Sequence, residues 1–372
     1  MLELPDFDAL SEEHDDILAL PLDASCLVTG PPGTGKTVMA IYRASVLHRS
    51  GRKPLLLMYG KLLSCYTKAA IGKLEIDGAV STYHSWFSSF WRRCYGARPP
   101  ESQPWVFDWS ACLDKIIANP PAPSERRHFL IDEGQDMPPD FYLLTKLLAE
   151  SLTVFADENQ RITGQQSTLA EIGAATGIRD LLKLTRNYRN TRPIAEFAAS
   201  FYTGLPSGIP DLPPISARGE LPFLIAHDKL HQTIEFIRNY ENNHSDHSIG
   251  VLLERKQQVK QFYNRLQAKT RNPVQVYLSQ DGGGVPPYPR IDFADPGIKL
   301  LTYRSAKGLE FDTVFLPELQ DITGDPSADD VRMRFYVMCS RAKKVLGLMY
   351  TGEGVPRFAQ ALPLGLMEDR RQ

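Results

Sequence analysis

The chain has 372 residues, 42% of them hydrophobic and 23% charged, which predicts a soluble globular protein of two or three domains. Lysine and arginine total 42 against 44 acidic residues, so no global positive field indicates nucleic acid, although a neutral protein can still carry a basic groove. Five scattered cysteines without a CxxC pair, an acidic N-terminus and no apolar run near ~18 residues argue against a zinc site, a signal peptide and a membrane span, so we expect a cytoplasmic protein.

The first half of the chain alternates between strand and helix patterns. Residues 25–30 are a short apolar run that enters a glycine-rich turn, and residues 37–50 follow with helical apolar spacing. Further strands are expected at 54–60, 128–132 and 152–157, with a helix at 141–152. This alternation predicts a parallel sheet covered on both faces.

Residues 86–127 interrupt this series. All four tryptophans lie there among proline clusters, which indicates a small irregular insertion. They are Trp86, Trp91, Trp105 and Trp109. The cluster is either a small satellite core or a docking patch for a partner.

A second series of strands and helices follows. Strands are expected at 222–227, 248–253, 298–303, 312–319 and 344–352, with helices at 229–242 and 256–267. We therefore predict two α/β domains, residues 1–185 and residues 186–372. The Gly- and Pro-rich segment 271–297 is expected to be an exposed loop in the second domain.

The turn after the first strand reads GPPGTGKT and matches the Walker A pattern G-x-x-x-x-G-K-S/T. Its glycines allow backbone N–H groups to surround phosphates, Lys36 neutralises the β- and γ-phosphate oxygens, and Thr37 ligates Mg²⁺. The residues expected to bind the nucleotide here are Gly30, Pro31, Pro32, Gly33, Thr34, Gly35, Lys36 and Thr37.

Asp132 and Glu133 end the apolar strand at 128–132. A carboxylate that holds Mg²⁺ and a base that activates water are both needed at such a position for triphosphate hydrolysis. The simpler interpretation is that two acids begin a solvated loop.

The sequence FLIDEGQDMPP at 129–139 resembles motif II of the UvrD/Rep/PcrA-like branch of superfamily I helicases. The other motifs of that family appear in order along nearly the whole chain. STYHSWF (81–87) is similar to motif Ib, VFADENQRI (154–162) to motif III, LTRNYRNTRPIAEFA (184–198) to motif IV, LLTYRSAKGLEFDTVFLPEL (300–319) to motif V and RFYVMCSRAKK (334–344) to motif VI. The resemblance implies two RecA-like domains in tandem, with the ATP site in the cleft between them.

The resemblance also implies roles for residues outside the Walker A turn. Gln160 would sense the γ-phosphate, Tyr188 would stack on adenine and Glu310 would accept hydrogen bonds from the ribose. Arg189 and Arg341 would act as arginine fingers that stabilise transition-state charge. For each arginine, the alternative is an ordinary surface salt bridge.

A nucleic-acid surface is implied by motifs Ia, Ib and V. Tyr59 holds the aromatic position of motif Ia, and Thr82 and His84 come from motif Ib. Motif V contributes Thr302, Tyr303, Arg304 and Ser305. For Tyr59 the alternative is a core aromatic residue at the end of a strand, and for His84 a structural role is also open.

Three departures from the family pattern stand out. His14 occupies the place of a glutamine that reads adenine, and an imidazole cannot present the paired donor and acceptor of an amide. Gln165 occupies the place of a base-stacking tryptophan. The accessory domains between motifs Ib and II and between motifs IV and V are absent or vestigial, so the chain resembles a minimal core.

Two functions remain open from the sequence. The first is an ATP-dependent single-stranded DNA translocase or helicase of 3′→5′ polarity, in which ATP hydrolysis with Mg²⁺ is coupled to closure of two RecA-like domains. The second is a regulatory ATPase that senses nucleic acid or nucleotide and switches a protein partner, such as a nuclease, without unwinding. DNA and RNA are not distinguished.

Overall fold

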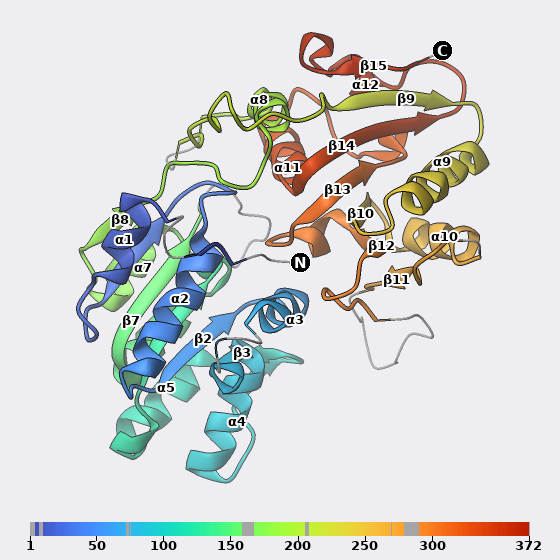
Figure 1. Cartoon of the computed structure of the whole chain (residues 1–372). Coiled ribbons are helices and arrows are strands. Elements are labelled where there is room, and N and C mark those ends of the chain that lie inside the picture. The colour runs from blue at the N-terminus through green and yellow to red at the C-terminus, as the bar shows by residue number, and fades with distance from the viewer. Residues whose placement is uncertain are drawn as a thin grey trace. The chain divides into compact units, whose positions relative to one another are not determined.

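The computed structural model describes residues 4–6, 10–71, 74, 76–157, 167–204, 208–268, 270–278 and 290–371. The chain divides into two compact units (Figure 1). The N-terminal unit contains the described residues up to Thr185 together with Gly208, and the C-terminal unit contains the others from Arg186 onward. Within the described ranges, no helix has both the length and the apolar content that crossing a membrane requires.

The N-terminal unit is built on a six-stranded parallel sheet with the strand order β3-β2-β6-β7-β1-β8. Its strands are β1 (Cys26–Thr29), β2 (Pro54–Met58), β3 (Val80–Thr82), β6 (Arg127–Asp132), β7 (Ala149–Ala156) and β8 (Leu181–Lys183). Both faces of β1 and β2 are buried, which explains their continuous apolar runs. Because parallel strands end at the same edge, the residues that follow β1, β6 and β7 lie together there.

Helices cover this sheet (Figure 1). They are α1 (Glu12–Leu18), α2 (Lys36–Arg49), α3 (Lys61–Ala70), α4 (Tyr83–Tyr95), α5 (Trp109–Ala118), α6 (Pro139–Leu148) and α7 (Leu169–Thr176). Helix α2 packs against β2, β6 and β7, whereas α4, α5 and α6 share a hydrophobic cluster with Leu57 and Phe129.

The predicted helix at 141–152 is wrong at its C-terminal end. Helix α6 stops at Leu148, and the next residues begin β7, where Ala149 pairs with Arg127 and Leu152 with Phe129. A continuous apolar run does not reveal by its periodicity where a buried helix becomes a buried strand.

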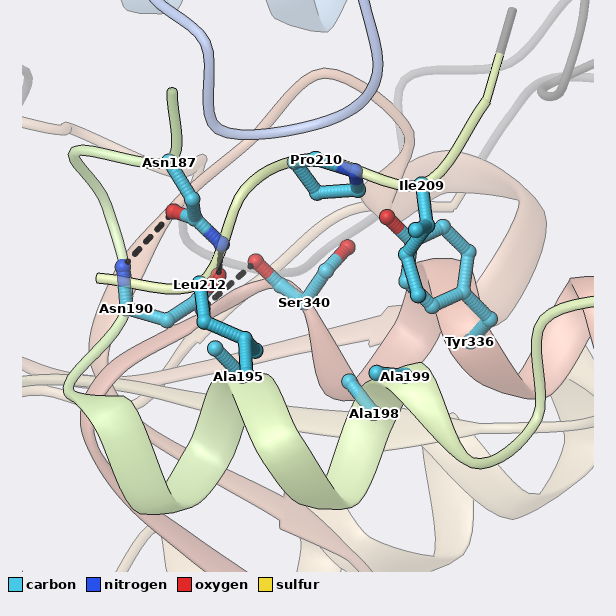
Figure 2. Close-up of a pocket in the computed structure, with 10 residues that line it drawn as sticks. All are labelled: Asn187, Asn190, Ala195, Ala198, Ala199, Ile209, Pro210, Leu212, Tyr336 and Ser340. Atoms are coloured by element: carbon cyan, nitrogen blue, oxygen red, sulfur yellow. Dashed lines mark hydrogen bonds between the residues drawn. The ribbon is translucent and has the colours of Figure 1, made fainter. Parts of the chain in front are cut away.

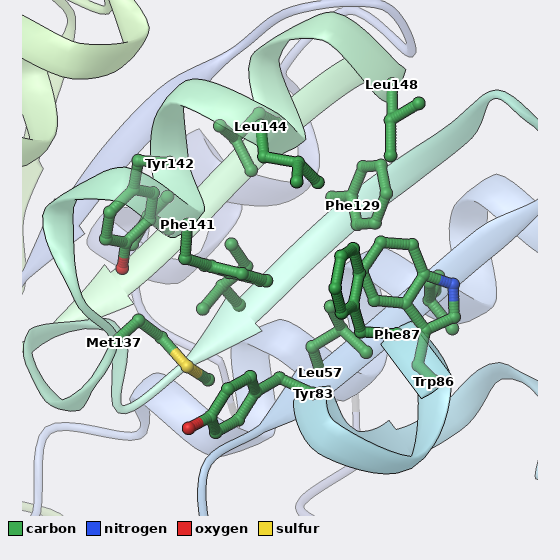
Figure 3. Packing of buried hydrophobic residues seen from close by; sticks show 14 of the residues in the cluster. Leu57, Tyr83, Trp86, Phe87, Phe129, Met137, Phe141, Tyr142, Leu144 and Leu148 are labelled. Atoms are coloured by element: carbon green, nitrogen blue, oxygen red, sulfur yellow. The ribbon is translucent and has the colours of Figure 1, made fainter. Parts of the chain in front are cut away.

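The segment expected to be irregular is largely regular. It contains the C-terminal part of α4, a hairpin of β4 (Glu101–Gln103) and β5 (Val106–Phe107), and α5. Trp86 and Trp91 are buried core residues, and the partly buried Trp109 packs against Phe87, which contacts both of them. Figure 3 shows Trp86 and Phe87 in this cluster. Trp105 is different, because 81% of its side chain is exposed.

The C-terminal unit has a seven-stranded parallel sheet with the order β11-β12-β10-β13-β14-β9-β15. Its strands are β9 (Phe223–His227), β10 (Ser248–Leu253), β11 (Gln275–Val276), β12 (Gly297–Thr302), β13 (Phe311–Leu316), β14 (Ala342–Thr351) and β15 (Glu368–Asp369). Its helices are α8 (Arg192–Ala199), α9 (Leu230–Asn243), α10 (Lys256–Leu266), α11 (Asp329–Cys339) and α12 (Arg357–Gln360). Two α/β units on parallel sheets confirm the predicted fold class of RecA-like domains.

Part of the segment expected to be an exposed loop at 271–297 is instead a strand. Gln275 and Val276 are buried and form β11, which pairs with Lys299 and Leu300 of β12 at the edge of the sheet. The centre of that segment, residues 279–289, lies outside the described residues.

Candidate nucleotide and nucleic-acid sites

The phosphate-loop sequence joins the end of β1 to the start of α2. Gly35 has a φ of 86°, and a Cβ there would lie 2.9 Å from Nε2 of His14. A Cβ on Gly30 would lie 2.6 Å from the carbonyl oxygen of Leu184. Both positions therefore require glycine, one for its backbone conformation and both for the close approach of neighbours.

Lys36 points into this loop. Its ammonium group donates hydrogen bonds to the carbonyl oxygens of Gly30 and Pro31, the latter at 3.0 Å. It also lies 3.6 Å from the carboxylate of Asp157, which is fully buried at the end of β7. The cation is thus held at the centre of the loop, where the sequence predicts that it neutralises phosphate oxygens.

Thr37 and Asp132 meet at the predicted metal position. The Thr37 hydroxyl donates a hydrogen bond of 2.8 Å to Oδ2 of Asp132, which is buried at the end of β6. The pKa of Asp132 is raised to about 7, mainly by burial and also by the charge of Glu133, while the Thr37 hydrogen bond and the Lys36 charge oppose the increase. Hydroxyl and carboxylate oxygens are ligands that Mg²⁺ prefers, so this pair fits one Mg²⁺ ion completed by phosphate and water.

Glu133 adopts a left-handed backbone conformation with a φ of 52°. Its carboxylate accepts a hydrogen bond of 2.5 Å from Nε2 of Gln135, whose Oε1 accepts one of 2.9 Å from the backbone N–H of Asp157. Gln135 is fully buried, so it ties the predicted base to the end of β7. Sequence reasoning missed Gln135 and Asp157, although the xQD that follows DE in motif II was a signal for Gln135.

His14 packs on the phosphate loop from α1. It is buried, its Nε2 lies 3.1 Å from the carbonyl oxygen of Thr34, and its Nδ1 accepts a weak hydrogen bond of 3.4 Å from the Ser11 backbone N–H. Because Nδ1 accepts from the Ser11 N–H, Nε2 is the donor to the Thr34 carbonyl oxygen. The residue predicted to lie at the adenine therefore also supports the loop around Gly35.

In the C-terminal unit, Arg189 and Glu310 are ion-paired. Nε and Nη2 of Arg189 lie 2.7 and 2.5 Å from Oε1 of Glu310, and both side chains are mostly buried. Arg341 is also buried and donates to the carbonyl oxygens of Val337 and Leu309 at 2.9 and 3.3 Å. The Arg189–Glu310 pair is mostly shielded from solvent and Arg341 is buried, so neither guanidinium lies on the exposed surface.

Asn187 and Asn190 hold the turn that carries Tyr188 and Arg189. The Asn187 amide donates to Oδ1 of Asn190 at 2.9 Å, and its own oxygen accepts from the Arg189 backbone N–H at 3.0 Å. The Asn190 amide donates to the carbonyl oxygen of Ser340, and these residues line a small pocket (Figure 2). Tyr188 itself is 48% exposed, which leaves its ring accessible.

Asn190 also bonds to the carbonyl oxygen on the other side of Arg341. Its amide lies 3.2 Å from the carbonyl oxygen of Ser340 and 2.5 Å from that of Ala342. A single buried side chain therefore fixes motif IV beside the arginine of motif VI. Both asparagines were missed as site residues, because nothing local in NYRN indicates partners about 150 positions away.

The predicted nucleic-acid residues of the N-terminal unit lie close together. Tyr59 is 43% exposed and stacks on Tyr83, with ring centroids 5.5 Å apart. Thr82 caps α4 by accepting a hydrogen bond from the Ser85 backbone N–H. The His84 ring lies 3.9 Å from that of Tyr83, and burial lowers the pKa of His84.

The predicted motif V residues differ in exposure. Arg304 is exposed, and Thr302 and Ser305 are half-buried and hydrogen-bonded to each other at 3.0 Å. Tyr303 is buried, so its ring is not presented to a ligand on the surface. Gln160 and Gln165, by contrast, lie outside the described residues.

Comparisons with known proteins identify two matching families. Residues 19–166 match the model of an AAA domain, and residues 290–353 match the UvrD-like helicase C-terminal domain. No curated protein matches the chain. A solved structure, the C-terminal domain of a possible DNA helicase from Lactobacillus plantarum WCFS1, is similar with 20% identity and a TM-score of 0.35, over 49% of this chain and 98% of that one. The family to which the chain is assigned therefore rests on the two family models.

Proposed function

Because the chain belongs to the UvrD-like helicases, we propose that it hydrolyses ATP to move along single-stranded DNA in the 3′→5′ direction. The observation that supports this proposal most strongly is the arrangement at one edge of the N-terminal sheet. Lys36 and Thr37 follow β1, Asp132 and Glu133 stand at the end of β6, and Asp157 follows β7 between them. This edge therefore brings together a cation, a hydroxyl–carboxylate pair and a carboxylate base, the groups that phosphoryl transfer to water requires.

Each group at this edge has a separate task. Lys36 and the backbone N–H groups of the loop bind the β- and γ-phosphates, while Thr37 and Asp132 hold Mg²⁺. The metal, when bound, neutralises charge on the phosphate oxygens. Glu133, oriented by Gln135, accepts the proton of the attacking water.

In this proposal, the C-terminal unit couples ATP hydrolysis to movement of the two domains. Tyr188 stacks on adenine, and Arg189 and Arg341 reach the γ-phosphate when the two domains close, together with Gln160. When the γ-phosphate is lost, the two arginines lose their ligand, so the two domains open again after each hydrolysis event. Alternate closure and opening moves the strand.

Two assays on the whole chain test this function. The first measures ATP hydrolysis with and without single-stranded DNA, with Lys36→Ala as the inactive control. The second measures streptavidin displacement from the 3′ or 5′ end of an oligonucleotide and unwinding of duplexes with either tail. DNA-stimulated hydrolysis with displacement from the 5′ end only is expected.

Each of the other outcomes would favour a different function or refute the proposal. Stimulation without displacement or unwinding would replace the motor by the regulatory ATPase, which acts through a protein partner such as a nuclease. If RNA but not DNA stimulated ATP hydrolysis, RNA would replace DNA as the proposed substrate. Absence of ATP hydrolysis under every condition would overturn the proposal.

A further inference from the structure

Trp105 presents its indole to solvent on the hairpin of β4 and β5. Its exposed fraction of 81% is the largest among the large hydrophobic side chains of the described residues. Trp86 and Trp91, in the same segment, are buried in the hydrophobic cluster of the N-terminal unit, in which Figure 3 shows Trp86. The exposed Trp105 indole does not gain the stabilisation that burial gives to Trp86 and Trp91, so core packing does not explain its position.

The backbone at Trp105 is strained. Its φ is 69°, a left-handed conformation that glycine adopts freely and that a bulky side chain adopts rarely. Glycine would suit the turn better, yet the largest side chain occupies it. Backbone strain of this kind is concentrated at active sites and ligand-binding sites.

Trp105 also connects to the predicted nucleic-acid residues of the same unit. Its carbonyl oxygen lies 3.2 Å from Nε2 of His84, whose ring lies 3.9 Å from that of Tyr83. Tyr83 in turn stacks on Tyr59 with an interplanar angle of 21°. The rings of Tyr59, Tyr83 and His84 thus follow one another, and Trp105 adjoins the His84 end through its backbone carbonyl. We call these four residues the aromatic row, and the side chains of Tyr59 and Trp105 at its two ends are exposed.

We propose that Trp105 is a stacking platform for a base of single-stranded nucleic acid, at the end of the aromatic row opposite Tyr59. This inference rests on the proposed function, because it assumes that the strand crosses the row. An indole face stacks on any base, which suits an enzyme that moves along a strand without reading its sequence.

The local charge favours a base over a phosphate at this point. The carboxylate of Glu101 accepts a hydrogen bond of 3.4 Å from the Trp105 backbone N–H. A negative charge there repels the phosphate backbone, whereas it does not oppose the stacking of an uncharged base. The strand therefore presents a base to Trp105, and basic groups elsewhere bind its phosphates.

The test measures binding of a fluorescein-labelled oligothymidylate of about 20 nucleotides by anisotropy, with the full chain. Trp105→Ala is expected to raise Kd about tenfold, within the range measured for loss of one stacked base. Trp105→Phe keeps a flat ring and is expected to stay within about threefold. Ile117→Ala, at another exposed apolar side chain of the same unit, is the matched control and should bind like the wild type.

Two further readouts separate ring stacking from folding. Trp105→Gly relieves the left-handed strain, so its melting temperature should equal or exceed that of the wild type while its affinity falls as in Trp105→Ala. Oligothymidylate should also quench the tryptophan emission of the wild type, and Trp105→Phe should abolish most of that quenching. Basal ATP hydrolysis without DNA should be the same in all variants.

Failure of this inference is distinguishable from failure of the proposed function. If the wild type binds oligothymidylate and Trp105→Ala binds equally well, Trp105 is no platform and the motor proposal stands. If the wild type binds neither oligothymidylate nor oligouridylate, the proposed function fails and the platform fails with it. A loss of affinity in Ile117→Ala as large as in Trp105→Ala would also overturn the specific role of Trp105.

Discussion

Replacement of Gln135 by methionine should cost both stability and turnover. The side chain is fully buried and makes two hydrogen bonds, one to the carboxylate of Glu133 at 2.5 Å and one to the Asp157 backbone N–H at 2.9 Å. A hydrogen bond to a charged group contributes about 1.5–3 kcal/mol, and a neutral one contributes about 0.5–1.5 kcal/mol. Methionine keeps the volume and loses both bonds, so we expect a loss of about 2–4 kcal/mol in the free energy of unfolding.

The catalytic effect follows from the position of Glu133. Without the Gln135 amide, the carboxylate is no longer tied to the end of β7, and we expect kcat to fall about tenfold or more, as for loss of a positioned proton acceptor. KM for ATP should change little, because Lys36 and Thr37 are untouched. Steady-state ATP hydrolysis measures kcat and KM. Urea denaturation measures the free energy of unfolding, and the comparison is valid if the denaturant slope m is the same in both proteins.

Hydrogen exchange supplies the most direct readout of this reasoning. The Asp157 amide should exchange faster in Gln135→Met, because it loses the acceptor Oε1. Gln103→Met, at an exposed glutamine of the same unit, is the matched control and should leave all three measurements unchanged. The reasoning is refuted if Gln135→Met keeps wild-type kcat and protection at Asp157, since neither bond would then matter.

The remaining predictions concern the proposed nucleotide-binding residues and Asn190, which holds motif IV beside motif VI. Lys36→Ala or Glu133→Gln should abolish ATP turnover, and wild-type rates in either variant would refute the site assignment. His14→Gln should increase selectivity for ATP over GTP in competition assays, because an amide offers both a donor and an acceptor, and unchanged selectivity would argue against His14 at the adenine. Asn190→Ala removes a buried amide that bonds to two carbonyl groups, so kcat should fall about tenfold, and a variant that changes only the melting temperature would assign it a purely structural role. Glu310→Gln should tighten ATP binding about threefold in fluorescence titrations by releasing its arginine partner, and weaker binding would indicate that ribose contact dominates.

The sequence predicted those features that depend on local pattern. The phosphate-loop turn at Gly30 and Gly35, the contact between Thr37 at the start of α2 and Asp132 at the end of β6, and the two parallel sheets follow from spacing, apolar runs and alternation. The end of α6 did not follow, because pairing with β6 decides it.

Long-range polar contacts were beyond the reach of sequence patterns. Gln135 bonds to a backbone group that lies 22 positions away, and Asn190 bonds to carbonyl groups about 150 positions away. The partners are main-chain atoms in both cases, so the residue types at the partner positions carry no signal. Tyr303 shows the converse, since its place in a surface motif did not indicate that its ring is buried.

The ion pair between Arg189 and Glu310 suggests how the proposed coupling of hydrolysis to movement works. In this structure the arginine neutralises one carboxylate at 2.5 Å, and both groups are mostly shielded from water. In the proposed closed state, a γ-phosphate must compete with Glu310 for the same guanidinium, and a multiply charged phosphate is a stronger partner than a carboxylate. Recruitment of Arg189 would free Glu310 to accept hydrogen bonds from the ribose, so both groups would engage the nucleotide together. Loss of the γ-phosphate would restore the pair, and the free energy of its re-formation would favour the open state after each hydrolysis event.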